Sequence, residues 1–163
     1  MKKAAAAILA ASIFLLTGCL KKSSECPYRV QVSQAPYSEE QAIANYLTSN
    51  GLTATKHSSN MYYSIAQTGS GGNPNLCSTV TVDYTGHLTD GSVFDSQING
   101  NFVLGSLIDG WKLGLPLIQK AGRIRLYIPP SLGYGSTDVK DGNGIIRIPA
   151  NSILIFDIEL TAF

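Results

Sequence analysis

Hydrophobic and polar residues alternate along several stretches of the chain after residue 60. In one of them Val80, Val82 and Tyr84 would face one side of a strand, while the polar residues between them face the other. Asp90-Gly91 is typical of a turn, and Val93-Phe94 would begin the strand that follows it. The predicted strands are residues 61–66, 79–88, 123–128 and 153–160.

A different spacing marks residues 38–50, where apolar residues recur as on one face of a helix. These apolar residues are Ala42, Ile43, Tyr46 and Leu47. Ser38 and Gln41 fit a capping box with Ser38 as the N-cap, and Gly51 is suited to ending the helix. Such a short amphipathic helix is marginally stable alone, so we expect it to dock on the rest of the chain. A dimer contact is the alternative use of its apolar face.

A second segment with helical spacing covers residues 107–117. Gly110, Gly114 and Pro116 limit it to a short helix. Several antiparallel strands around one short central helix indicate an α+β domain. We place this domain at residues 60–163 and a short helical extension at residues 38–59.

The first eighteen residues have the layout of a secretory signal peptide. Lys2 and Lys3 precede an uncharged, mostly apolar run over residues 4–16. As a helix this run would span about 20 Å, less than the roughly 30 Å hydrocarbon core of a bilayer. The stretch ends in Leu16-Thr17-Gly18-Cys19, which resembles a bacterial lipobox. The resemblance implies a lipoprotein signal peptide over residues 1–18, cleavage before Cys19 and lipidation of Cys19. An ordinary cleaved signal with an incidental cysteine is the alternative.

Residues 19–37 have no sustained hydrophobic period and contain two lysines and two prolines. We interpret them as a lipidated tether between a membrane and the domain. Several acyl chains would make the anchoring stable. The domain would then lie at a bacterial cell envelope, facing the periplasm or the cell exterior.

Composition and charge exclude several classes of protein. The net charge is +1 and only 14% of residues are charged, which argues against a nucleic-acid-binding protein. Loss of Lys2 and Lys3 with the signal peptide would change the net charge to −1. A hydrophobic content of 44% argues against a disordered chain. Cys26 and Cys77 would remain in an oxidising compartment, and the sequence leaves open whether they form a disulfide bond or stay free thiols.

No motif for metal, cofactor or nucleophilic chemistry stands out. His57 and His87 are the only histidines, and neither is spaced to pair with a carboxylate or a cysteine. Residues 69–72 lack the context of a phosphate-binding loop. Residues 138–144 lack the ligand spacing of a calcium loop, so we interpret them as a turn. We expect neither a metal nor a cofactor.

Aromatic residues and small turn residues occur together in one order within residues 60–163. The six motifs are Val82-Asp83-Tyr84-Thr85-Gly86, Asp90-Gly91-Ser92-Val93-Phe94-Asp95-Ser96, Asp109-Gly110-Trp111, Ile128-Pro129-Pro130, Gly133-Tyr134-Gly135 and Ile148-Pro149-Ala150-Asn151-Ser152. In this combination the chain closely resembles the FKBP-type peptidyl-prolyl cis–trans isomerases over the full length of such a domain. The resemblance implies a twisted antiparallel β-sheet, a half-barrel, wrapped around one short α-helix.

The resemblance also implies the residues of a substrate pocket between the sheet and the helix. The catalytic residues would be Asp95, Tyr134, Phe94 and Ile108, and the substrate-binding residues would be Tyr84, Phe102, Leu107, Trp111, Ile148 and Phe156. Trp111 would form the floor under the substrate proline ring. The Ile108 N–H and the Tyr134 hydroxyl would donate hydrogen bonds to substrate carbonyls, and the three Phe side chains would form the walls, with Asp95 nearby.

These residue types suit the implied reaction. Rotation about an X–Pro bond crosses a barrier of about 18–20 kcal/mol because twisting destroys amide resonance. The planar amide is the more polar species, so an apolar, water-poor pocket disfavours it relative to the twisted one. Holding the flanking carbonyls orients the chain while one end rotates. No bond is made or broken, so catalysis would be differential binding without a base or a metal.

Two features depart from the family pattern. The loop formed by residues 136–147 is longer than in the minimal family domain, and the corresponding loop lies over the pocket in the family. The length of this loop would therefore affect sequence preference or the affinity for macrolide inhibitors. Leu107 stands where the family commonly has Val.

We expect a monomer that acts on proline-containing polypeptides among exported proteins. The alternatives are a chaperone that holds proline-containing segments with little or no isomerase activity, and a structural envelope lipoprotein.

Overall fold

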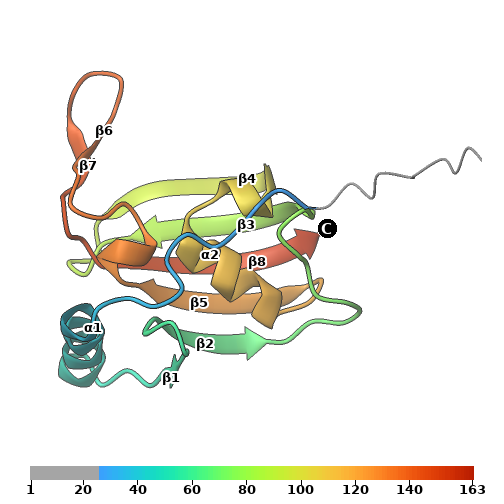
Figure 1. Ribbon diagram of the computed structural model, residues 1–163, viewed down its shortest axis with the longest axis horizontal. Helices are drawn as coiled ribbons and strands as arrows, with labels where there is room; N and C mark the ends of the chain where they lie inside the picture. The colour runs from blue at the N-terminus through green and yellow to red at the C-terminus, as the bar shows by residue number, and fades with distance from the viewer. Residues whose placement is uncertain (1–25) are drawn as a thin grey trace, which may run out of the picture.

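The computed structural model describes residues 26–163. Six antiparallel strands form one sheet in the order β1-β2-β5-β8-β3-β4 (Figure 1). The strands are β1 (Thr55–Lys56), β2 (Tyr62–Gln67), β3 (Thr79–His87), β4 (Val93–Val103), β5 (Gly122–Ile128) and β8 (Leu154–Ala162). A separate hairpin pairs β6 (Val139–Lys140) with β7 (Ile146–Ile148) and projects from one end of the domain. The predicted strands are confirmed to within one or two residues at each end.

Two α-helices pack on opposite faces of the sheet. The short helix α2 (Asp109–Gly114) crosses one face, between 3-10 turns at Leu104–Ser106 and Leu115–Leu117. Helix α1 (Tyr37–Ser49) lies at one end of the other face. A sheet around one short central helix, with an N-terminal helical extension, confirms the predicted α+β, FKBP-like fold.

The main core lies between the sheet and α2. Inward-facing residues of β3, β5 and β8 are fully or almost fully buried there, together with Leu115 and Trp111. The two glycines of α2 make this packing possible. A Cβ at Gly110 would come within 2.6 Å of the Ile128 side chain, and one at Gly114 within 2.6 Å of Leu126. The residues that limit the length of α2 therefore also let it approach the sheet.

A second, smaller core forms under α1. Ile43 and Leu47 of α1 are buried against Tyr127 of β5 and Ile155 of β8. Successive strand residues point to opposite faces, so these two positions face away from the main core. The apolar face of α1 is thus covered by the sheet of its own chain, as the docking prediction requires.

The predicted capping box at the start of α1 is wrong. The N-cap is Pro36, two residues before Ser38, and it makes no side-chain cap, so Ser38 lies inside the first turn. The Gln41 amide donates instead to the Glu40 carboxylate at 2.9 Å. The proline ring holds φ of Pro36 at −55°, close to the helical value, so the chain already approaches helical geometry before it reaches Ser38. Gly51 follows the helix with φ +64°, in the place predicted for it.

The expected tether is only partly within the described residues, and that part is not a free linker. Residues 26–36 cross the same face of the sheet as α2 (Figure 1). Ala35 is buried in the main core, and Val32 packs against it. Cys26 and Cys77 form a disulfide bond with a Cα–Cα distance of 5.7 Å, which decides between the two alternatives. The signal peptide over 1–18, the proposed lipid site Cys19 and the remainder of the tether lie outside the described residues.

The segment 136–147 contains the β6–β7 hairpin, whose turn is organised by one carboxylate. The Asp141 side chain accepts hydrogen bonds from the backbone N–H groups of Asn143 and Ile145 at 2.9 and 3.0 Å. It also pairs with Arg147 at 2.9 Å. Asp141 therefore serves the turn, and residues 26–163 contain no cluster of potential metal ligands. Within the same residues, no helix has both the length and the apolar character required to cross a membrane.

Candidate functional site

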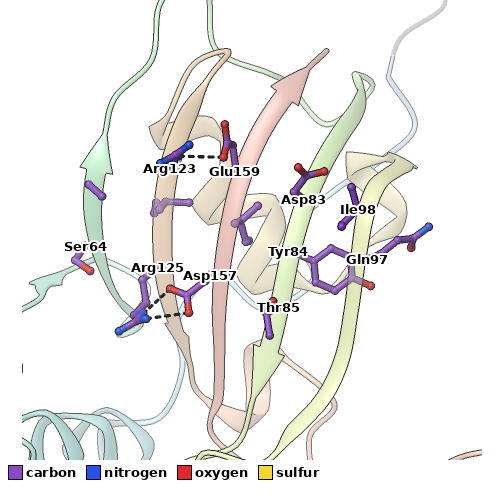
Figure 2. A pocket seen from close by; sticks show the side chains of 13 residues that line it. Ser64, Asp83, Tyr84, Thr85, Gln97, Ile98, Arg123, Arg125, Asp157 and Glu159 are labelled. Atoms are coloured by element: carbon purple, nitrogen blue, oxygen red, sulfur yellow. Dashed lines mark hydrogen bonds and ion pairs between the residues drawn. The ribbon is translucent and has the colours of Figure 1, made fainter.

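A broad depression lies on the sheet face that α2 does not cover (Figure 2). It has a volume of about 700 Å³ and is lined mainly by polar and charged residues of β2, β3, β5 and β8. Arg123 pairs with Glu159 at 3.0 Å, and Arg125 pairs with Asp157 at 2.6 Å. Because these charges neutralise one another across neighbouring strands, the depression presents few unpaired groups to a ligand.

Asp157 also holds a histidine that sequence spacing left without a partner. The His87 Nε2 atom lies 2.9 Å from the Asp157 carboxylate, across the β3–β8 ladder. The resulting group of three is part of the paired surface of the sheet. We therefore assign this face a structural role.

A smaller depression lies between the sheet and α2 and has a volume of about 190 Å³. Its lining is largely aromatic and comes from five separate parts of the chain. The lining residues are Tyr84 (β3), Asp95 and Phe102 (β4), Leu107, Ile108 and Trp111 (the start of α2), Tyr134 (the loop after Leu132) and Phe156 (β8). The fold thus gathers eight of the ten site residues predicted from the sequence.

Trp111 lines this pocket, and its indole is packed against other aromatic rings. Its side chain is 4% exposed. The rings of Tyr84 and Phe156 each lie 5.2 Å from the indole, in edge-to-face geometry. Such pairs contribute about 0.5–1.5 kcal/mol each beyond the area they bury. The indole N–H is buried and has no hydrogen-bond acceptor within residues 26–163.

A hydrogen bond connects the two polar residues at the β3–β4 side of the pocket. The Tyr84 hydroxyl donates to the Asp95 carboxylate at 2.6 Å. Burial raises the pKa of Tyr84 well above its usual value, and the bond to Asp95 raises it further. Tyr84 therefore stays protonated at neutral pH and keeps the Asp95 carboxylate in place.

Tyr134 is the most accessible aromatic residue of the pocket, with 44% of its surface exposed. Its hydroxyl makes no hydrogen bond with the described part of the chain. Partial burial raises the pKa of Tyr134, and the charge of Asp95 adds to this effect. The hydroxyl is therefore a neutral donor that a ligand can use.

Ile108 contributes a backbone donor at the other side of the pocket. It is the N-cap of α2, and its carbonyl accepts the Trp111 and Lys112 N–H groups at 3.0 and 3.2 Å. The N–H of Ile108 itself has no acceptor among the described residues. The first amide groups of a helix lack partners within the helix, which leaves this donor for a ligand.

Two predicted site residues do not line the cavity. The Phe94 ring instead contacts the lining residue Phe156 edge to face, with ring centres 5.4 Å apart. Ile148 is 4% exposed and belongs to the main core. Asp109, next to Ile108, contacts the N-terminal segment, and the sequence does not predict this contact because the residues involved are 77 and 78 positions apart.

Comparison with known proteins identifies relatives of this chain. The family described as FKBP-type peptidyl-prolyl cis-trans isomerase matches residues 71–161. FkpA of Aeromonas hydrophila is 34% identical over 127 residues, which cover 76% of this chain and 44% of that protein. FkpA of Escherichia coli (strain K12) is 40% identical over 107 residues, which cover 63% of this chain and 37% of that protein. The chain spans less than half the length of these curated relatives.

Solved structures show the same relationship. The crystal structure of FkpA from Escherichia coli superimposes with a TM-score of 0.65 at 34% identity, covering 77% of this chain and 59% of that chain. A peptidyl-prolyl cis-trans isomerase from Pseudomonas syringae pv. tomato also gives a TM-score of 0.65, at 27% identity, covering 79% of this chain and 96% of that chain. The family match covers more than half of the sequence. The chain belongs to the FKBP-type peptidyl-prolyl cis–trans isomerase family.

Proposed function

We propose that this protein is a peptidyl-prolyl cis–trans isomerase that acts on X–Pro bonds of exported polypeptides. The observation that carries the proposal is the aromatic pocket of about 190 Å³ between the sheet and α2. Its base, walls and two free hydrogen-bond donors come from residues that the family resemblance assigns to the site. The pocket is compact and apolar, as a site for a proline ring requires.

The apolar lining would lower the barrier by favouring the twisted amide. Rotation out of plane removes conjugation and leaves an amide that is less polar than the planar ground state. Trp111 would hold the proline ring from below, while Phe102 and Phe156 exclude water from the rotating bond. Only interactions that are stronger in the twisted state accelerate the rotation.

The two free donors would hold the chain on either side of the rotating bond. The Ile108 N–H and the Tyr134 hydroxyl would each bind a substrate carbonyl, which fixes the flanking segments. Asp95 would act through its charge next to the amide and through its bond to Tyr84. Phe94 would act indirectly, by supporting Phe156 from behind.

A protease-coupled isomerisation assay on the full-length chain in mild detergent tests the proposal. X–Pro peptides with different X residues should isomerise faster than the uncatalysed reaction. Asp95→Ala should lower the rate. Asp83→Ala removes a carboxylate on the outer face, the sheet face that α2 does not cover, and should not lower the rate. A wild-type rate equal to the background would contradict the enzyme. Peptide binding without acceleration would instead favour a holding chaperone.

We further propose that Cys19 carries a lipid that anchors the protein to the cell envelope. The apolar run before Cys19 and its lipobox-like sequence support this. The Cys26–Cys77 disulfide supports export, since disulfide bonds persist mainly in oxidising compartments. Labelling with radioactive palmitate should mark the wild type but not Cys19→Ala. Equal labelling of the two would reject the anchor.

A further inference from the structure

The N-terminal segment, residues 26–49, contacts the pocket elements from outside the pocket. The backbone N–H groups of Gln31 and Val32 donate to one oxygen of the Asp109 carboxylate at 2.9 and 2.6 Å. Asp109 is the first residue of α2, and it follows Ile108 directly. A backbone segment far away in the sequence therefore fixes the end of the helix that carries both Ile108 and Trp111.

Both oxygens of the Asp109 carboxylate accept hydrogen bonds. Its second oxygen accepts a hydrogen bond from the Lys112 ammonium group at 3.0 Å. Asp109 and Lys112 are 7% and 9% exposed. Burial disfavours the charged carboxylate, but the hydrogen bonds from Val32 and Lys112 outweigh this and keep the pKa of Asp109 below its usual value. The carboxylate itself does not line the pocket.

A second contact connects the same N-terminal segment to the other side of the pocket. Glu39 in the first turn of α1 accepts hydrogen bonds from the Ser131 N–H and hydroxyl at 2.9 and 2.8 Å. Ser131 lies in the 3-10 turn Pro130–Leu132, immediately before the loop that carries Tyr134. The two free donors of the pocket thus each lie close to a residue that the N-terminal segment holds.

The N-terminal segment is fixed at both of its ends. The disulfide bond from Cys26 to Cys77 secures its beginning, and the docking of α1 under Tyr127 secures its end. Between them, Tyr28 occupies the space beside Gly105, where any Cβ would collide with its ring. A segment held in this way can transmit a defined position to the elements it touches.

We propose that residues 26–49 are a positioning element for the isomerase site. Through Asp109 they set the Ile108 N–H and Trp111, and through Glu39 they set the loop of Tyr134. This inference rests on the proposed function of the pocket. Asp109 and Glu39 are positioning residues, because neither lines the cavity. Displacement of a binding group by about 1 Å can cost two orders of magnitude in rate, so small shifts at these contacts matter.

The substitution Asp109→Asn tests the proposal in the full-length chain. An amide has one acceptor oxygen, so it cannot satisfy both the N-terminal segment and Lys112. Asp157→Asn is the matched control: its carboxylate also accepts several hydrogen bonds, but on the opposite face of the sheet. Both variants are compared with the wild type below their melting temperatures.

Two measurements separate positioning from stability. The first is KM against kcat for an X–Pro peptide. The second is Trp111 fluorescence, which reports on the pocket alone because the chain contains one tryptophan. For Asp109→Asn we expect KM to rise about tenfold with a smaller change in kcat, together with greater quenching of the fluorescence by acrylamide. Asp157→Asn should leave both measurements unchanged.

The outcomes distinguish this inference from the proposed function. An inactive wild type contradicts the function, and the fluorescence comparison still tests the positioning. If the wild type is active and Asp109→Asn changes neither KM nor the quenching of Trp111, the inference is overturned. It is also overturned if Asp157→Asn changes KM and quenching as much as Asp109→Asn does. If Asp109→Asn does not fold, Glu39→Gln decides: a raised KM with unchanged Trp111 quenching supports the inference, and an unchanged KM overturns it.

Discussion

The disulfide bond between Cys26 and Cys77 gives a stability prediction that can be worked out from the fold. The two cysteines are 51 residues apart. Closing a loop of this length removes conformational entropy from the unfolded chain, which is equivalent to about 4 kcal/mol at 25 °C. At about 2.1 cal/mol/K per residue, the total unfolding entropy of the described domain is roughly 0.3 kcal/mol/K, and the change in Tm is the lost free energy divided by this entropy. Loss of the disulfide bond should therefore lower Tm by about 14 °C.

The assay is thermal unfolding of the double variant Cys26→Ser/Cys77→Ser, followed by circular dichroism. The wild type under strong reductant should melt with the double variant, and reductant should not change the double variant further. Cys19→Ser is the control, because it removes the only other cysteine and keeps the disulfide bond. A decrease in Tm of less than about 4 °C would refute the loop-closure reasoning, since it corresponds to only about 1 kcal/mol.

Three further predictions concern the pocket, the outer face and the core. Tyr134→Phe should lower kcat/KM about tenfold in the isomerisation assay with an unchanged Tm, because its hydroxyl has no partner in the described residues; an unchanged kcat/KM would remove Tyr134 from the site. Burial opposes ionisation of Asp157, but the bonds from Arg125 outweigh it and lower the pKa of the carboxyl. The stability that this pair contributes should be present at neutral pH and be lost on acidification below about pH 4, as the carboxyl becomes protonated in the folded state. Melting curves from pH 7 to 3 should show a smaller decrease in Tm for Asp157→Asn than for the wild type, and parallel decreases would contradict the pairing. Gly110→Ala should destabilise the fold by about 1–3 kcal/mol in urea unfolding, because the new methyl group would overlap Ile128; a neutral effect would show that α2 can move away from the sheet.

Most of the sheet could be predicted from the sequence because its strands bury one face. β3, β5 and β8 each place alternate apolar residues in the main core, and this produces the period of two. For β4, the sequence predicts only the start at Val93-Phe94, whereas the strand extends to Val103. It is an edge strand whose residues are mostly exposed, Ile98 to 78%, so most of its length shows no alternation of buried and exposed positions.

The pocket lining could be predicted only through the family resemblance, since its residues come from five parts of the chain. The arrangement of residues 26–36 could not be predicted at all. The hydrogen bonds that connect them to α2 use backbone N–H groups, which are the same in every non-proline residue and leave no pattern in the sequence. The disulfide bond was likewise one of two open alternatives, because sequence alone contains no distance between Cys26 and Cys77.

Fixing Cys26 to the domain also limits how far the domain could move from a membrane. If Cys19 carries the lipid, the distance from Cys19 to Cys26 cannot exceed ~25 Å, the reach of a fully extended chain of this length. A globular domain of roughly 140 residues has a diameter of about 37 Å, so this maximum distance is less than the domain is wide. A protein anchored in this way would move along the bilayer surface, in two dimensions, and would meet chains that emerge from or adhere to that surface before any that diffuse freely.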